Sequence, residues 1–266
     1  MKSIKDLVNT NVDTPKLSNE EFLKRDSDYY NQQVGNLTEY DCPICKNKGN
    51  MLKVVFDDYY KDYIQKMVVC ECMKKRETIK RAKDSGLGEY IYKKFDDYIA
   101  EKDWQKAIKQ KAIDYLKADD DKWFVILGQS GAGKTLICSI ISRHLLANRN
   151  VIYITWTDFI SQLKRDMMGD NSNEVTSYLE NIKKTDVLFI DELLKKYNET
   201  DLKYIIEIIN YRYTNRLKTI ITSEKVLEEL LEIDEATFSR VVEMSDKYIT
   251  NIKKDTSKNY RLRNIL

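Results

Sequence analysis

The order of apolar and polar positions changes character near the middle of the chain. From Trp123 onward, five short apolar runs (WFVIL, VIYIT, DVLFI, KTIITS and, more weakly, KYITNI) alternate with longer segments of mixed polarity. Short apolar runs are typical of strands buried on both faces, and strands that alternate with helices pair in parallel. This half of the chain is therefore predicted to have an α/β fold, a parallel sheet flanked by helices.

The residues before Trp123 have a different pattern of apolar and polar positions. Residues 1–36 are polar and predicted to be helical, with Ser18 and Glu21 spaced as a capping box before an apolar pair. A cysteine-containing region follows, and then MKKRETIKRAKDSG, which is predicted to form a basic helix. We place a domain boundary near residue 88. It separates a small N-terminal domain, 1–88, from the α/β domain, 89–266.

Composition narrows the classes of function. Among 266 residues, 42% are hydrophobic and 33% are charged, which suits a globular protein with a core. The 45 basic and 43 acidic residues give a net charge of only +2, so any nucleic-acid surface must be local. No apolar run reaches the roughly 18 residues of a membrane span, and no signal peptide is recognisable. We expect a cytoplasmic protein with reduced thiols and no membrane partner.

The stretch GQSGAGKT fits the phosphate-binding motif G-x-x-x-x-G-K-[ST]. It follows an apolar strand and precedes a helical run, which is the context the motif requires. Its glycines let backbone N–H groups face phosphate oxygens, Lys134 is predicted to reach the β- and γ-phosphates, and Thr135 to coordinate Mg²⁺. The predicted ATP-binding residues are Gly128, Gln129, Ser130, Gly131, Ala132, Gly133, Lys134 and Thr135.

A second motif, VLFIDE, ends a predicted strand with two carboxylates. Asp191 is predicted to hold Mg²⁺ through water, and Glu192 to polarise the attacking water as a general base. The alternative for Glu192 is a solvated residue at a helix start. The position of the motif downstream of a phosphate-binding loop favours the catalytic interpretation.

Four of the five cysteines form two close pairs. Cys42 and Cys45 lie in CPIC, and Cys70 and Cys72 lie in CEC. The intervening segment is predicted to form a hairpin that returns the second pair to the first, where four thiolates would complete a closed, structural Zn²⁺ site. The alternative is two pairs of free core cysteines. Cys138 is predicted to be a small core residue.

Three later blocks carry a resemblance to a known family. EIINYRYTNRLKTIITSE (207–224), IDEATFSRVVEM (233–244) and NYRLR (259–263) resemble blocks of the DnaC/DnaI-type bacterial helicase loaders. These are AAA+ ATPases of the initiator clade, related to the transposition helper IstB. The resemblance spans roughly residues 120–263. It implies an AAA+ core with little or no C-terminal lid, ATP and Mg²⁺ as ligands, and ATPase activity, which we expect to be low in this chain.

The resemblance also assigns roles to individual residues. Arg240 in FSR matches the arginine finger, which reaches the γ-phosphate bound by a neighbouring subunit. Arg261 in NYR matches the second sensor, a phosphate contact from the same or a neighbouring subunit. Arg212 in NYRY matches a family arginine to which no role is assigned. The alternative for each is a surface salt bridge, which the position of Arg240 in the pattern disfavours.

One position departs from the family pattern. After IITS the loaders usually carry Asn as a polar sensor, and this chain has Glu224, whose charge would repel a γ-phosphate. Either Thr222 or Ser223 performs the sensing, or Glu224 points away, or hydrolysis is slow.

The expected function is that of a helicase loader. The resemblance implies a DnaB-type replicative helicase hexamer and single-stranded DNA as partners, with self-association through the ATP sites. The zinc domain would engage the helicase. The basic residues after Cys72 either contact DNA or an acidic helicase surface, or form a solvated helix face; they are Lys74, Lys75, Arg76, Lys80, Arg81 and Lys83. Two alternatives are an IstB-like transposition helper and a nucleotide-switched adaptor or inhibitor without significant turnover.

Overall fold

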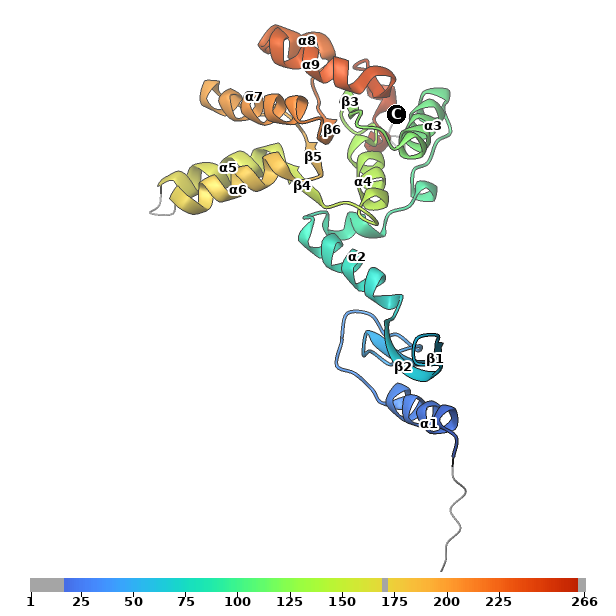
Figure 1. Cartoon of the computed structure of the whole chain (residues 1–266). Helices are drawn as coiled ribbons and strands as arrows, with labels where there is room; N and C mark the ends of the chain where they lie inside the picture. Colours follow the sequence, from blue (N-terminus) through green and yellow to red (C-terminus); the bar gives the residue numbers. More distant parts are fainter. Residues whose placement is uncertain (1–16, 169–171, 263–266) are drawn as a thin grey trace, which may run out of the picture. The chain divides into compact units, whose positions relative to one another are not determined.

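The computed structural model describes residues 17–168 and 172–262. The chain divides into two compact units, Met1–Glu77 and Thr78–Leu266, and the division falls inside the basic helix α2 (Cys72–Asp84) (Figure 1). The residues just after α2 belong to the second unit, since Leu87 is buried in its core and Tyr153 donates a backbone hydrogen bond to the Ser85 carbonyl at 2.7 Å.

The first unit consists of a helix and a hairpin. Helix α1 (Asn19–Gln32) begins with the predicted capping box, because Ser18 and Glu21 bond to each other's backbone N–H groups. Strands β1 (Asn50–Asp57) and β2 (Asp62–Val69) pair antiparallel over their whole length. The Gln65 side chain joins β2 to α1 through the Leu23 carbonyl at 3.2 Å. The hairpin predicted between the two cysteine pairs is therefore present.

The second unit is built on a five-stranded parallel sheet in the order β4-β5-β6-β3-β7. All five predicted apolar runs form its strands: β3 (Phe124–Gly128), β4 (Val151–Thr155), β5 (Val187–Asp191), β6 (Lys218–Thr222) and β7 (Ile249–Ile252). The α/β fold class is confirmed. Strand β3 lies inside the sheet, so the loop that leaves its carboxyl end emerges beside the ends of β6 and β7.

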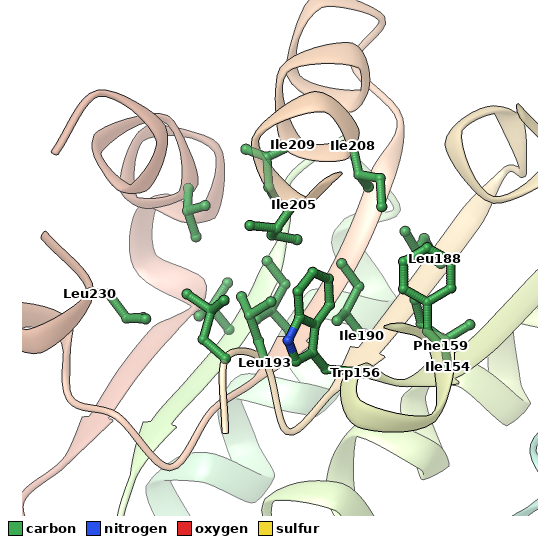
Figure 2. Close-up of a cluster of buried hydrophobic side chains, with 14 of the residues drawn as sticks. Ile154, Trp156, Phe159, Leu188, Ile190, Leu193, Ile205, Ile208, Ile209 and Leu230 are labelled. Carbon is green, nitrogen blue, oxygen red and sulfur yellow. The ribbon is translucent and has the colours of Figure 1, made fainter. Parts of the chain in front are cut away.

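Two apolar clusters lie on opposite faces of this sheet. Successive side chains of a strand point to opposite faces, and β5 contributes Leu188 and Ile190 to one cluster but Phe189 to the other. Figure 2 shows the first cluster, in which Trp156 and Ile205 pack near the β5 residues. The helices of this unit are α3 (Asp103–Ala118), α4 (Lys134–Leu145), α5 (Trp156–Met168), α6 (Ser172–Lys184), α7 (Glu199–Thr214), α8 (Leu227–Ile233) and α9 (Glu235–Ser245).

Helices α3 and α4 pack on the second face, together with the 3₁₀ turns at Gly88–Tyr92 and Phe95–Asp97. Cys138 is fully buried there among apolar side chains, as predicted for a small core residue. None of the helices in the described ranges is long and apolar enough to cross a membrane.

Arg212 on α7 is a fully buried cation, with 0% exposure. Its guanidinium donates to the Thr219 hydroxyl at 2.9 Å and to four carbonyl oxygens, those of Ile182, Lys183, Thr185 and Lys218. Burial lowers its pKa to about 9, so it stays protonated at neutral pH. Arg212 therefore ties the end of α6 to the start of β6, which gives this arginine a structural role that the sequence left open.

Candidate functional site

The phosphate-binding motif forms the tight loop between β3 and α4. Gly128 has φ +95°, and a Cβ there would lie 2.0 Å from the Ile252 carbonyl oxygen. Gly131 has φ +73°, and a Cβ there would lie 1.9 Å from the Asn259 Oδ1 atom. Only glycine fits either position. The loop is therefore enclosed by β7 and by the segment that follows it.

Lys134 is the first residue of α4 and is largely buried. Its ammonium donates to the carbonyl oxygens of Gly128 at 2.8 Å and Gln129 at 2.7 Å. Burial lowers the pKa of Lys134, while the charges of Glu224 and Asp191 raise it. The loop thus holds one cation at the centre of its curl, where the motif places the lysine that meets phosphate.

Asp191 lies at the end of β5 among three hydroxyl groups. Thr135 Oγ1 is 3.0 Å from both carboxylate oxygens, Tyr153 donates at 3.1 Å, and Thr222 donates to Oδ1. Burial raises the pKa of Asp191, although these hydrogen bonds lower it. The predicted Mg²⁺ pair, Thr135 and Asp191, is therefore brought together, and a carboxylate beside a hydroxyl suits a hard cation.

Glu192, the next residue, lines the same pocket as the phosphate-binding loop. Its backbone is left-handed, with φ +55°, and its N–H donates to Thr222 Oγ1 at 3.0 Å. Its side chain forms an ion pair with Lys195 at 2.8 Å. The predicted general base therefore lies in the pocket wall, with its carboxylate held by Lys195.

The pocket has a volume of about 230 Å³ and is walled by four parts of the chain. Its residues are Tyr90, Asp97, Tyr98, Ile99 and Gln105 before β3; Ser130 to Leu136 in the loop and α4; Glu192, Thr222, Ser223 and Glu224 after β5 and β6; and Tyr260 and Arg261. Sequence reasoning missed the first group. These residues lie in or just after the 3₁₀ turns η2 (Gly88–Tyr92) and η3 (Phe95–Asp97) and at the start of α3, and no motif marks them.

Ser223 and Glu224, the two residues at the predicted sensor position, lie in different surroundings. Ser223 is fully buried, and its hydroxyl donates to the Leu193 carbonyl at 2.7 Å. Glu224 lines the pocket and accepts a hydrogen bond from the Ser130 hydroxyl at 2.7 Å. Burial raises the pKa of Glu224, but the bond from Ser130 and the charge of Lys195 lower it overall. Glu224 therefore points into the pocket rather than away from it.

The two predicted catalytic arginines lie in different places. Arg261 lines the pocket, where its neighbour Tyr260 donates its N–H to the Gly131 carbonyl at 2.9 Å. Arg240 on α9 bonds to the Asn210 side chain and lies over the Tyr213 ring at 5.7 Å. It is not among the described residues that line the pocket.

The four paired cysteines converge in the first unit. Their Sγ atoms all lie within 4.8 Å of one another, with Cys42 3.8 Å from Cys70 and Cys45 3.5 Å from Cys72, and all four are buried. A tetrahedral site with Zn–S bonds of about 2.3 Å needs sulfur atoms about 3.8 Å apart. The cluster therefore fits a closed zinc site, and the hairpin brings the pairs together as predicted.

The basic run of α2 is partly used inside the protein. Arg76 is buried and donates to the Tyr40 carbonyl at 2.5 Å, beside the cysteine cluster. Arg81 donates to the carbonyl oxygens of Leu146 and Ala147, at the end of α4. Two of the six cations considered for a contact with DNA or with an acidic helicase surface are therefore bonded within the protein.

A family model described as IstB-like ATP binding protein matches residues 59–254. The chain belongs to this family. Among curated relatives of this IstB-like chain, the uncharacterized protein YqaM of Bacillus subtilis (strain 168) is 27% identical over 277 residues, covering 84% of this chain and 86% of YqaM. The replicative helicase loader DnaC of Buchnera aphidicola subsp. Schizaphis graminum is 26% identical over 140 residues, covering 51% of this chain and 57% of that protein.

Solved structures agree with this assignment at the level of the fold. The DnaC helicase loader aligns with a TM-score of 0.54 and 21% identity, covering 63% of this chain and 99% of its own. DnaI aligns with a TM-score of 0.50 and 22% identity, covering 62% of this chain and 92% of its own. The resemblance to DnaC/DnaI-type AAA+ loaders related to IstB is confirmed.

Proposed function

We propose that the chain is a cytoplasmic, ATP-dependent loader that delivers a hexameric DnaB-type replicative helicase to single-stranded DNA. The observation that carries the proposal is the pocket in which a phosphate-binding loop, the Thr135–Asp191 pair and Glu192 meet. The relatives suggest the class of task, since one of those with a named activity is the replicative helicase loader DnaC.

In this proposal each residue of the pocket has a defined task. The loop N–H groups and Lys134 bind the phosphates, and Arg261 contributes a second cation. Thr135 and Asp191 hold Mg²⁺, which supplies neutralisation of the phosphate charge when it is bound. Glu192 orients and deprotonates the attacking water. The buried position of Asp191 and the left-handed turn at Glu192 keep these groups rigid before nucleotide enters.

Self-association completes the site. Arg240 lies on α9 and is not among the described residues that line its own subunit's pocket, so in this proposal it serves the site of another copy. Nucleotide turnover would then depend on assembly, since the finger neutralises charge that develops on the transferring phosphoryl group. Low activity of the isolated subunit is the expected consequence.

The first unit is the proposed helicase-binding module. Its four clustered thiols and short hairpin leave little apolar core, so bound zinc would supply folding free energy. The metal would fix the hairpin relative to the CPIC turn, and the surface so formed would contact the helicase.

A nucleotide-switched adaptor without significant turnover is the second candidate, because Glu224 faces the pocket where loaders carry Asn. The two functions differ in turnover. ATP hydrolysis in the presence of helicase and single-stranded DNA, abolished by Glu192→Gln, supports the loader. ATP binding without hydrolysis under the same conditions supports the adaptor.

The direct test is co-purification with the replicative helicase of the host, with and without ATP. The expected result is a stable complex with ATP that Lys134→Ala abolishes, while zinc content stays unchanged in that variant. Tight binding to duplex DNA without a helicase complex would contradict the loader and select a transposition helper.

A further inference from the structure

The turn that follows β5 is fixed at several points. The Leu193 and Leu194 side chains are fully buried, and Leu194, like Glu192, is left-handed with φ +56°. The Leu193 N–H donates to the Thr222 carbonyl at 2.8 Å, and its own carbonyl accepts the Ser223 hydroxyl. Left-handed non-glycine residues carry strain that persists only where surrounding contacts hold them. The backbone that leads into Lys195 is therefore held in one conformation.

Lys195 lies between two carboxylates of the pocket. Its ammonium is 2.8 Å from Glu192 Oε1 and 3.7 Å from Glu224 Oε1, and the same Glu224 oxygen accepts the Ser130 hydroxyl. Both glutamates line the pocket, whereas Lys195 is not among the described lining residues. The lysine thus approaches both carboxylates from outside the space that the phosphates would fill.

Two carboxylates beside a phosphate-binding loop create an electrostatic problem. The terminal phosphate of ATP carries negative charge, and like charges within a few ångströms raise each other's free energy. Glu192 is required as a base, so its charge cannot be removed. Glu224 adds a second charge on the same wall, and it is anchored to the loop through Ser130. A cation shared by both would offset this repulsion.

We propose that Lys195 is a positioning residue that neutralises Glu224 and holds Glu192, and so lets the pocket accept the terminal phosphate of a nucleoside triphosphate. This rests on the proposed ATP site and explains how the site tolerates a glutamate at the sensor position. Lys195 touches neither substrate nor metal in this assignment. It acts through the two glutamates.

The test compares ATP and ADP affinities of the full chain by fluorescent-nucleotide titration. Lys195→Ala should weaken ATP binding about fivefold, given two partly exposed ion pairs, and change ADP binding less than about twofold. Lys195→Arg should retain the wild-type ratio. Lys254→Ala is the matched control, because Lys254 pairs with Glu229 at 2.6 Å and with neither pocket glutamate. Thermal unfolding of each variant checks that it is folded.

A double variant gives an independent readout. Glu224→Gln combined with Lys195→Ala should return the ATP-to-ADP affinity ratio to within about twofold of wild type, because the charge that needed compensation is gone. An unchanged ratio in folded Lys195→Ala, or no recovery in the double variant, would overturn the inference. A wild-type chain that binds neither nucleotide would instead overturn the proposed function, so the two failures are distinguishable.

Discussion

Replacing Asp191 with Asn should stabilise the nucleotide-free protein and at the same time impair magnesium-dependent nucleotide binding. Asp191 is 4% exposed, so its carboxylate loses several kcal/mol of hydration, while three hydroxyl donors return about 1.5–3 kcal/mol each. The raised pKa of Asp191 indicates that burial outweighs these bonds. Asn is nearly isosteric and uncharged. We expect the free energy of unfolding of the nucleotide-free protein to rise by about 1 kcal/mol, which corresponds to about 2–4 °C in Tm.

The sign of the pH dependence follows from the direction of that pKa shift. A carboxyl group whose folded-state pKa is raised loses its contribution to stability as pH rises through that pKa, because the folded state must then carry the charge. The advantage of Asp191→Asn should therefore be present at neutral pH and shrink in acid, where Asp191 is protonated.

The assay is thermal unfolding without nucleotide, followed by titration of ATP with and without Mg²⁺. Asp191→Asn should lose at least about tenfold in Mg²⁺-dependent ATP affinity. Asp186→Asn is the control, because Asp186 lies on the surface just before the same strand. A lower Tm combined with an intact Mg²⁺ effect would refute both the electrostatic reasoning and the metal assignment.

Three further changes test separate parts of the protein. Arg240→Ala should bind ATP normally yet hydrolyse it at least about tenfold more slowly in the assembled state, and a wild-type rate in a turnover assay would remove it as the finger. Cys70→Ser should lose bound zinc, measured by metal analysis, together with helicase binding; one equivalent of tightly held zinc would contradict the site. Arg212→Lys should lower the free energy of unfolding, measured by chemical denaturation, by about 2–4 kcal/mol, because an ammonium has three donors for five acceptors. A change below about 0.5 kcal/mol would count against the structural role of Arg212.

The parts of the site that the sequence predicted are those encoded locally. The phosphate-binding loop and the strand ending in Asp191 are continuous segments whose spacing and apolar context suffice to identify them. The cysteine cluster needed only the added expectation of a hairpin, which the structure contains. Local patterns of this kind survive folding because neighbouring residues keep their relative positions.

Contacts between distant segments could not be predicted in the same way. Tyr98 carries no motif and joins the pocket wall only because the chain returns to the loop. Lys195 meets Glu192 locally, but it reaches Glu224 only because β6 pairs with β5. Arg212 was recognisable as a member of a pattern, yet its role depends on carbonyl groups from α6 and β6. One cation of the basic run on α2 does not lie at the surface, because charge in a sequence does not reveal that Arg76 is buried.

The most direct test of the account is helicase loading on a closed circle of single-stranded DNA that carries an annealed oligonucleotide. A ring helicase cannot thread onto a closed circle unaided, so displacement of the oligonucleotide reports loading. The account predicts that displacement by the DnaB-type helicase requires this protein with ATP, and that Lys134→Ala gives none. Displacement that is equally fast without this protein, or equally fast with Lys134→Ala, would contradict the proposed ATP-dependent loading.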